Sequence, residues 1–438
     1  MTSWSYHQGK VIKLVINSPR GTADIYGEDI KYRDFISSTV RGVFKTFNFN
    51  ELITPAFEYT EVFSRSIGEE TDIVKKEMYT FNDKKGRSLT LRPEGTAAVV
   101  RAAVERKMFG SGNLPIKLFY MGNMFRYERP QKGRMREFWQ LGVEALGSDN
   151  PVLDAEIIWM LNMIFKRLGF KNLVLLVNSI GCLKCRKTFI QEFKKYLEPG
   201  KTGLCGDCIK RLKNNPLRIF DCKVNGCREI AQKGPRISGY LCSSCKTHFK
   251  DLTDTLSGLS VDFKISDSLV RGFEYYTRTV FEIISNDLES AQNALGGGGR
   301  YDDLVGQFGG PDMPAIGFAV GIDRTIMLMK DLGIEYVPDT KNIRAYLVLI
   351  DGECKGYMLE ILRYLRDSGI SCDINYTSRS IKAEIKKAEK LEFDIIAFLG
   401  ENERKDDTVT LKGLKDFKQY IVSKNEIVEK IFEIAGRI

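Results

Sequence analysis

The chain has 438 residues, of which 43% are hydrophobic and 28% are charged, and its net charge is +9. This is the composition of a soluble globular protein of about two to four domains. Its apolar runs stay below the roughly eighteen residues of a membrane span, and residues 1–14 lack the apolar stretch of a signal peptide. The sequence therefore predicts no transmembrane helix, and we expect a cytoplasmic protein.

Short strands and amphipathic helices are expected along the first part of the chain. Apolar residues recur at helical spacing over Ile30–Phe47, and a short strand follows over Leu52–Ala56. Pro55 lacks a backbone N–H, which suits the edge of a sheet or a subunit boundary. Two strand segments and a helix come next, over Asp72–Phe81, Ser88–Leu91 and Gly95–Lys107.

The densest group of charges lies in Phe125–Glu144, which holds four arginines: Arg126, Arg129, Arg134 and Arg136. Apolar strands are expected on both sides, over Lys117–Arg126 and Phe138–Ala145, with Pro130–Gly133 as the turn. The planar guanidinium fork of arginine matches phosphate oxygens. Two strands that carry arginines inward from both arms predict a nucleotide site, whereas the alternative is a solvated hairpin tip with ion pairs.

Cysteines become frequent after a helix over Asp149–Leu168 and a buried strand over Leu173–Val177. Eight of the ten lie in four close pairs: Cys182/Cys185, Cys205/Cys208, Cys222/Cys227 and Cys242/Cys245. Such pairs make poor disulfides in a reducing cytosol but suit tetrahedral thiolate ligation, so structural zinc is predicted, with thiols enough for two sites. The alternatives are a redox pair or reduced thiols left from an ancestral metal site. We expect His248 to be unligated rather than to replace a thiol.

The same segment carries the excess positive charge of the chain. Residues 182–250 contain 16 Lys and Arg against 5 Asp and Glu, a net charge of +11, so the remainder of the chain has a net charge of −2. Two zinc ions on eight thiolates would still leave the segment at about +7. This charge predicts a polyanion as partner, nucleic acid first, and a merely solubilising basic patch is the alternative.

Two motifs place charged side chains at the start of expected helices. In Leu91–Thr96 (LRPEGT), Glu94 sits beside exposed backbone N–H groups, where a carboxylate can bind a ligand ammonium. The alternative is a helix cap with a salt bridge to Arg92. In Ala315–Arg324 (AIGFAVGIDR), a glycine-bearing strand runs into a helix from which Arg324 would clamp or stack on a nucleotide, and a surface ion pair is the alternative.

Two further motifs fall on expected strands. In Leu269–Glu282 (LVRGFEYYTRTVFE), Tyr275 and Tyr276 should point to opposite faces, so that one packs and one faces a pocket. Arg271 is placed as a positioned cation, and an ordinary aromatic strand is the alternative. In Leu295–Leu304 (LGGGGRYDDL), four glycines let the backbone approach a small ligand closely, and a flexible surface hairpin is the alternative.

From about residue 342 the pattern changes to strands that alternate with helices. The weak pattern over Gly333–Lys341, which contains Pro338, marks a linker before this region. The alternation predicts a small α/β domain with a largely parallel sheet. Its strands are expected over Arg344–Ile350, Cys372–Tyr376 and Asp394–Leu399, and its helices over Lys355–Ser368, Lys382–Leu391 and Lys424–Ile434.

In combination and in this order, the motifs resemble those of the histidyl-tRNA synthetases, a family of class II aminoacyl-tRNA synthetases, over essentially the whole chain. Pro19–Asp24 (PRGTAD) resembles the family's first motif, and the helix and strand up to Pro55 resemble motif 1, which builds the dimer interface in this class. Phe125–Glu144 and Ala315–Arg324 resemble motifs 2 and 3. The motifs with the paired tyrosines and the glycine run resemble the two histidine-specific signatures.

The resemblance implies an α+β fold: a class II synthetase catalytic core, with an antiparallel sheet and surrounding helices, in residues 1–181 and 251–332. A cysteine-rich basic insertion domain, expected near the tRNA acceptor stem, would occupy residues 182–250. Residues 333–341 would form the linker, and residues 342–438 the α/β anticodon-binding domain.

The resemblance also implies the activity. The family activates L-histidine with ATP and Mg²⁺ to histidyl-adenylate and pyrophosphate, and then transfers histidine to the 3′ end of tRNA(His), as a homodimer with no membrane. The attacking carboxylate of histidine is already ionised, so no protein base is needed. Fixed arginines and Mg²⁺ neutralise the charge that spreads over the phosphates.

Residue roles follow from the same resemblance. The histidine pocket would be lined by Glu94, Thr96, Gln140, Glu144, Tyr275 and Tyr276. Arg126 would bridge the amino-acid carboxylate and the α-phosphate of ATP, and Arg271 would be the further cation there, in place of a metal ion. Glu128 would hold the adenine amino group, and Arg134 and Arg324 the triphosphate.

Two other functions are weighed against this one. A regulatory subunit of histidine biosynthesis is paralogous to the family, but it would have lost part of the Arg271 region and the C-terminal domain. A non-catalytic zinc and nucleic-acid-binding protein with a dead synthetase core would not need the motif arginines. Arg271, Tyr275, Tyr276 and residues 342–438 are all present, which favours the synthetase.

Overall fold

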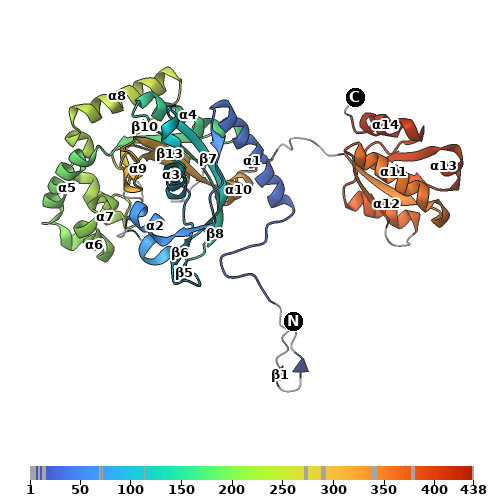
Figure 1. The fold of residues 1–438 in the computed structure, drawn as a ribbon, viewed down its shortest axis with the longest axis horizontal. Helices are drawn as coiled ribbons and strands as arrows, with labels where there is room; N and C mark the ends of the chain where they lie inside the picture. The colour runs from blue at the N-terminus through green and yellow to red at the C-terminus, as the bar shows by residue number, and fades with distance from the viewer. Residues whose placement is uncertain are drawn as a thin grey trace. The chain divides into compact units, whose positions relative to one another are not determined.

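The computed structural model of the chain divides into two units, Met1–Val337 and Pro338–Ile438, which we describe separately (Figure 1). The division falls inside the predicted linker. Among the described helices, none is long and apolar enough to span a membrane. The structure describes residues 6–7, 10–11, 16–68, 71, 73–112, 114–131, 133–270, 275–287, 293–336, 343–375 and 380–436.

An eight-stranded sheet, in the order β10-β9-β11-β12-β13-β8-β7-β3, forms the centre of the first unit. The pairings from β9 through to β7 are antiparallel, and only the outermost pairs, β10 with β9 and β3 with β7, are parallel. The predicted antiparallel core is thus confirmed. In that order the strands span Lys264–Ile265, Leu173–Ser179, Thr277–Ser285, Ala294–Arg300, Ala315–Gly321, Glu137–Leu146, Ile116–Phe125 and Asn50–Glu51.

Three helices cover one face of this sheet, and the other face carries a cavity beside the helix over Thr96–Glu105 (α3). Alternate residues of β8 explain the division, because successive side chains of a strand point to opposite faces. Leu141, Val143 and Ala145 join the main core with apolar residues of the covering helices, whereas Gln140 and Glu144 point to the other side. The covering helices are α1 (Glu28–Thr46), α4 (Pro151–Arg167) and α10 (Ile322–Asp331).

A small sheet in the order β4-β6-β5 lies beside the helices α2 and α3. The strand expected over Leu52–Ala56 is wrong: pairing stops at Glu51 and resumes at Phe57, with Pro55, which has no N–H to donate, between them. These elements span Phe57–Tyr59 (β4), Ser88–Leu91 (β6), Thr80–Asn82 (β5), Thr60–Ile67 (α2) and Thr96–Glu105 (α3).

The strand expected over Asp72–Phe81 is mostly wrong. Ile73–Glu77 form a π-helical turn, and pairing begins only at Thr80. Ile73 and Val74 are consecutive apolar residues that pack against Val62, Phe63 and Ile67 of α2. A helical turn can bury both side chains on one side, whereas a strand would point them to opposite faces. Asp72 lies outside the described residues.

The cysteine-rich segment folds as short helices around an aromatic core. Phe193 stacks on Phe189 and Phe220 with ring centroids 5.3 and 4.9 Å apart. The last helix, α8, crosses the boundary predicted at residue 250, and its second half packs along α4 in the main core (Figure 1). The helices are α5 (Leu183–Leu197), α6 (Gly206–Asn214), α7 (Asn225–Lys233) and α8 (Ser243–Gly258), with 3₁₀ turns at Lys201–Gly203, Pro216–Ile219 and Ile237–Tyr240.

Short elements complete the first unit. They are β1 (Tyr6–His7), β2 (Lys10–Val11), α9 (Leu304–Gln307) and a 3₁₀ turn at Met108–Ser111.

The second unit holds a five-stranded sheet in the order β15-β14-β16-β17-β18. The α/β domain is confirmed, but the sheet is only half parallel: β14 runs parallel to both neighbours, whereas β17 is antiparallel to both of its own. The final helix begins at Ile427 rather than Lys424, after a 3₁₀ turn. Tyr376, the expected end of one strand, lies outside the described residues.

The strands of this unit, in chain order, are β14 (Arg344–Leu349), β15 (Ser371–Ile374), β16 (Ile395–Leu399), β17 (Thr408–Gly413) and β18 (Gln419–Ser423). Its helices are α11 (Lys355–Asp367), α12 (Ile381–Lys390), α13 (Glu401–Asp406) and α14 (Ile427–Ile434), with 3₁₀ turns at Gly352–Cys354 and Lys424–Glu426.

Candidate active site and cysteine clusters

A cavity of about 890 Å³, here called the main cavity, lies on the face of the large sheet that carries Gln140 and Glu144. Its lining brings together the described residues that the sequence assigns to histidine: Glu94, Thr96, Arg126, Gln140, Glu144, Tyr275 and Tyr276. Arg271 lies outside the described residues, but Val270 and Tyr275, the nearest described residues on either side, both line the cavity.

Two buried carboxyl groups face this cavity. Glu94 caps α3, because its carboxylate accepts hydrogen bonds from the backbone N–H of Thr96 at 2.7 Å and of Ala97 at 2.9 Å. Glu144 of β8 accepts from the Thr96 hydroxyl at 2.7 Å and from the Tyr301 hydroxyl. Glu94 thus caps the helix and also lines the cavity, whereas the Arg92 guanidinium, the salt-bridge partner of the alternative, donates to Thr54 and Asn123 instead.

Burial controls the protonation of these carboxyl groups. It raises the pKa of Glu144 to about 8, although the donors Thr96 and Tyr301 favour the ionised form. Burial also raises the pKa of Glu94. A carboxyl group with a pKa near neutrality can either donate to or accept from an imidazole nitrogen, which makes Glu144 suited to a heteroaromatic ligand.

Glycines leave room for an acidic and an aromatic side chain on the side of the sheet that carries Glu144. A Cβ at Gly317 would lie 2.0 Å from Glu144 Oε2, and one at Gly142 would lie 2.5 Å from the Tyr120 ring. The carboxyl group and the ring therefore occupy the space that side chains on these strands would fill.

The paired tyrosines differ from the prediction. They precede β11 instead of lying within it, so the alternation of a strand does not apply to them. Tyr275 and Tyr276 are both buried, both line the main cavity, and their ring centroids are 4.7 Å apart.

A second cavity of about 390 Å³ adjoins the first and is lined by all the residues assigned to ATP: Arg126, Glu128, Arg134 and Arg324. Arg126 and Arg134 line both cavities. Glu128 lies between them, with its carboxylate 3.2 Å from Arg134 Nη1 and 3.7 Å from Arg126 Nη1. Burial first, and the Arg134 cation second, lower the pKa of Arg324, as expected where cations converge on a site for an anion.

Arg136 and Asp323 have structural contacts instead. The Arg136 guanidinium stacks 3.9 Å from the Tyr127 ring centroid, and its backbone N–H donates to Gly21 O at 2.7 Å. Asp323 forms an ion pair with Arg33 of α1 and accepts from the Trp139 backbone N–H at 2.5 Å. These contacts hold the motif 2 hairpin and the motif 3 helix in place.

The eight paired cysteines gather in two groups of four, in each of which the sulfur atoms all lie within 4.8 Å of one another. Sulfur atoms of Cys182 and Cys185 are 3.5 Å apart, and those of Cys205 and Cys222 are 3.8 Å apart, so neither pair is a disulfide. The proximal cluster comprises Cys182, Cys185, Cys242 and Cys245, and the distal cluster comprises Cys205, Cys208, Cys222 and Cys227.

Comparisons with known proteins agree with this geometry. The family model of histidyl-tRNA synthetase matches residues 21–191 and 222–325, and the anticodon binding domain matches residues 344–434. The chain belongs to the histidyl-tRNA synthetase family. The match leaves residues 192–221, which contain half of the distal cluster, outside the regions shared with that family model.

Known relatives align with almost the whole length of this family member. A histidine–tRNA ligase of Halothermothrix orenii is 45% identical over 416 residues, which cover 95% of this chain and 99% of the relative. That of Bacillus subtilis is 42% identical over 413 residues, covering 94% and 97%. The crystal structure of the apo histidyl-tRNA synthetase of S. aureus is similar, with a TM-score of 0.81 and 35% identity, covering 95% of this chain and 100% of that one.

The sequence did not single out two cavity residues of this family member, Tyr301 and Glu282, or a core tyrosine on the same side of the sheet, Tyr120. Tyr301 lies two residues after the glycine run and donates to Glu144, and burial keeps its pKa well above the ordinary value, so it remains a neutral donor. Glu282 closes the tyrosine motif and lines both cavities. Tyr120 lies beneath Gly142, and no local pattern marks it as different from a core tyrosine.

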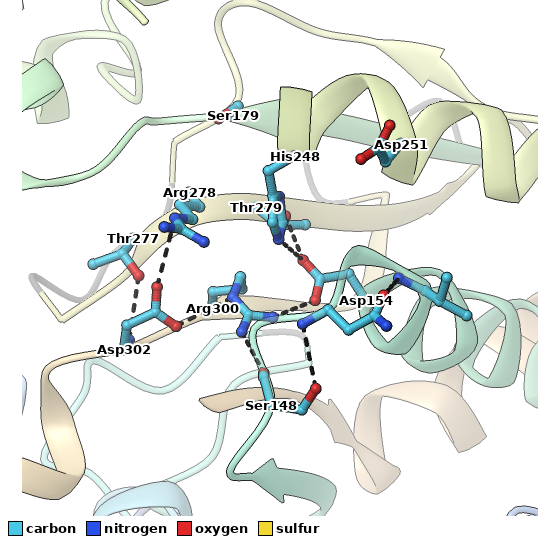
Figure 2. Close-up of polar contacts among 12 residues, drawn as sticks. Ser148, Asp154, Ser179, His248, Asp251, Thr277, Arg278, Thr279, Arg300 and Asp302 are labelled. Carbon is cyan, nitrogen blue, oxygen red and sulfur yellow. Dashed lines mark hydrogen bonds and ion pairs between the residues drawn. The ribbon is translucent and has the colours of Figure 1, made fainter. Parts of the chain in front are cut away.

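A buried polar network lies beside the glycine strand β12 (Figure 2). Arg300, the last residue of β12, is fully buried and donates to Asp154 of α4 and, at 2.5 Å, to the Ser148 carbonyl. Asp154 also accepts from the Thr279 hydroxyl at 2.6 Å, and His248 Nε2 of α8 lies 3.5 Å from the same oxygen. His248 therefore belongs to this network and to neither cysteine cluster, as expected.

Proposed function

We propose that this chain is a histidine–tRNA ligase, which activates histidine with ATP and then esterifies tRNA(His). Two adjoining cavities that share Arg126 and Arg134 support this function more than any other observation. Buried acids and tyrosines gather in the main cavity, and the second cavity adds Arg324 to the two shared arginines. Such a pair suits an amino acid and a nucleotide that must react across a common boundary.

In the main cavity, Glu144, Thr96 and Gln140 would pair the imidazole nitrogens, with Tyr275 and Tyr276 packed against the ring. Glu94 would bind the ammonium group of histidine beside the start of α3. An amino acid without an imidazole would leave these buried polar groups unpaired, which strongly disfavours its binding.

In the second cavity, Arg134 and Arg324 would bind the triphosphate and Glu128 the adenine amino group. Arg126 would bridge the carboxylate of histidine and the α-phosphate, with Arg271 as the further cation there. Mg²⁺ would arrive with ATP, and the carboxylates Glu128 and Glu282 in this lining are ligands of the kind it prefers. When bound, it would neutralise charge on phosphate oxygens.

Histidine-dependent exchange of pyrophosphate into ATP tests the activation step. We expect exchange with histidine and not with other amino acids. A folded chain that binds histidine but supports no exchange would instead act as the regulatory paralogue, and one that binds tRNA but not histidine would be a non-catalytic nucleic-acid-binding protein.

We propose a homodimer in the cytoplasm as the working form, with motif 1 at the subunit interface. Ile53, Phe57, Tyr59 and Phe81 are exposed large apolar side chains near this motif, as a covered surface would require. Light scattering coupled to gel filtration should give twice the mass of one chain, and a monomer active in tRNA charging would contradict this assembly.

We also propose that each cysteine cluster binds one structural zinc ion. Four thiolates at about 2.3 Å from zinc in a tetrahedron lie about 3.8 Å from one another, close to the observed separations. Elemental analysis should find about two zinc ions per chain. Metal-free protein with an ordered insertion would refute zinc and leave the cysteines as ordinary reduced thiols.

A further inference from the structure

The distal cluster forms part of the wall of the main cavity. Cys205 and Cys222, two of its four residues, line the same cavity as Glu94 and Glu144. In contrast, among the described residues the proximal cluster contributes none to either cavity lining. The proximal cluster lies at the start of α5 and α8, the first and last helices of the insertion, and so links the two ends of the insertion.

Around the distal cluster, three cations face the main cavity. Arg211 of α6, Arg218 of the Pro216–Ile219 turn and Lys223 of the following loop all belong to the lining, together with Asp207 and Asp221. The three cations come from the insertion, so they are separate from the arginines that line the second cavity.

The distal cluster joins the short elements of the insertion that carry the three cations. Its cysteines come from the start and first turn of α6, from the loop after the Pro216–Ile219 turn, and from α7. Backbone N–H groups of Cys205 and Val224 point at sulfur atoms of Cys227 and Cys222, at 3.2 and 3.4 Å. Helices of nine residues have little stability of their own, so cross-linking four points of the chain fixes where the cations stand.

We infer that metal at the distal cluster holds Arg211, Arg218 and Lys223 as a phosphate-binding wall for the 3′ end of tRNA, and so supports transfer of histidine but not its activation. This inference rests on the metal binding and the activity proposed above. The 3′ end is the polyanion that must enter the main cavity to reach the activated histidine. The insertion around it has a net charge of +11, or about +7 with two zinc ions bound.

The test separates the metal, the cations and the two half-reactions. Cys205→Ser/Cys222→Ser should lower zinc from about two ions to about one per chain. It should keep histidine-dependent pyrophosphate exchange within about twofold and lower kcat/KM for tRNA charging by about tenfold or more, as for loss of charge-assisted contacts to phosphate. Intrinsic tryptophan fluorescence checks that the first unit remains folded.

A second variant tests the wall with the metal in place. Arg218→Ala/Lys223→Ala should retain both zinc ions and exchange, but raise KM for tRNA by about tenfold or more and reduce the salt dependence of tRNA binding. Lys210→Ala/Lys213→Ala is the matched control, since these lysines are exposed on α6, the helix that carries Arg211, and lie outside the cavity lining, and it should charge tRNA normally.

Each contrary result identifies what is wrong. Equal loss of exchange and charging in the cysteine variant would show that the distal cluster only supports the active-site fold. Loss of exchange in Arg218→Ala/Lys223→Ala would assign the cations to ATP. Normal charging by that variant would show that these cations do not bind the 3′ end of tRNA. Wild-type protein without zinc, but active in exchange, would refute the metal and leave the proposed activity standing.

Discussion

At the scale of single residues, the two carboxyl groups of the main cavity show how burial prepares a site for its ligand. Glu94 uses its oxygens to end a helix, and Glu144 is surrounded by hydroxyl donors at the bottom of a space that Gly317 leaves open. Among the described contacts, both groups accept hydrogen bonds from backbone N–H or hydroxyl donors and not from a cation. The imidazole and ammonium groups of histidine would supply the missing partners.

Stability should reflect the raised pKa of Glu144. Its folded-state pKa of about 8 lies above the ordinary carboxyl value, so the proton stabilises the fold at low pH and this contribution is lost as pH rises through about 8. The melting temperature of the wild type relative to Glu144→Gln should therefore fall between about pH 5 and pH 8.5. Tryptophan fluorescence gives this measurement for the first unit, which contains all three tryptophans. A difference that does not vary with pH would show Glu144 ionised throughout.

Replacement of Arg271 should affect activation specifically. Arg271→Ala should lower the rate of adenylate formation by about 10²-fold or more while histidine binding is largely kept, because one preorganised charge donor is lost at the α-phosphate. Pyrophosphate exchange and isothermal titration with histidine measure the two quantities. Arg129→Ala, an exposed arginine outside both cavity linings, should retain normal exchange. Unaffected adenylation in Arg271→Ala would remove its assigned role.

At the scale of elements, strands and helices with strong periodicity were predicted well, and elements held by tertiary contacts were not. The motif 2 strands β7 and β8 lie within a few residues of their predicted bounds, because apolar runs and a clear turn define them. The π-helical turn at Ile73–Glu77 depends on packing against α2, which local sequence does not contain. On the edge strand β18, Ile421 is exposed, so the apolar pattern gives little sign of a strand there.

The candidate site divides in the same way. Motif residues such as Glu94, Gln140 and Arg324 were found because their order along the chain resembles a family. The pairing of cysteines into clusters was not predictable, since eight thiols allow many groupings. Arg300 shows a further limit: it follows the four glycines that the sequence assigns to a ligand, yet it turns into the core to meet Asp154.

The buried network beside β12 should contribute strongly to stability. Asp154→Ala would remove the fully buried carboxylate that pairs with Arg300 and leave only the less buried Asp302, which lies 3.1 Å from Arg300 Nε, so the free energy of unfolding of the first unit should fall by about 3–5 kcal/mol. Urea unfolding followed by tryptophan fluorescence measures this change. Asp251→Ala, an exposed carboxylate on α8 near the network, should change stability by no more than about 0.5 kcal/mol. A stable Asp154→Ala protein would mean that Asp302 and the Ser148 carbonyl suffice for Arg300.

At the scale of the whole molecule, the chain combines two units with separate cores. The first contains both cavities and both cysteine clusters, and the second matches the anticodon binding domain. The proposed reaction and the binding of the anticodon are thus assigned to two different units of the chain.

Separation of the two units should therefore separate the two activities. A fragment of residues 1–337 should retain histidine-dependent pyrophosphate exchange but charge tRNA about 10²-fold less efficiently or worse, because two linked binding units gain from effective concentration. Steady-state charging with varied tRNA measures the loss. Full charging by the fragment would show that the second unit contributes little to tRNA binding.

The glycine strand β12 also bears on resistance to inhibitors. Gly297 exposes backbone to both cavities, a Cβ at Gly298 would lie 1.9 Å from the Gly317 carbonyl, and one at Gly299 would lie 2.4 Å from the Thr279 carbonyl. The strand thus presents main-chain atoms that point mutations cannot alter without distorting the sheet. An inhibitor that gains its affinity from this strand would leave the target few escape mutations, whereas one that depends on Arg211, Arg218 and Lys223 of the insertion would meet side chains that are free to change.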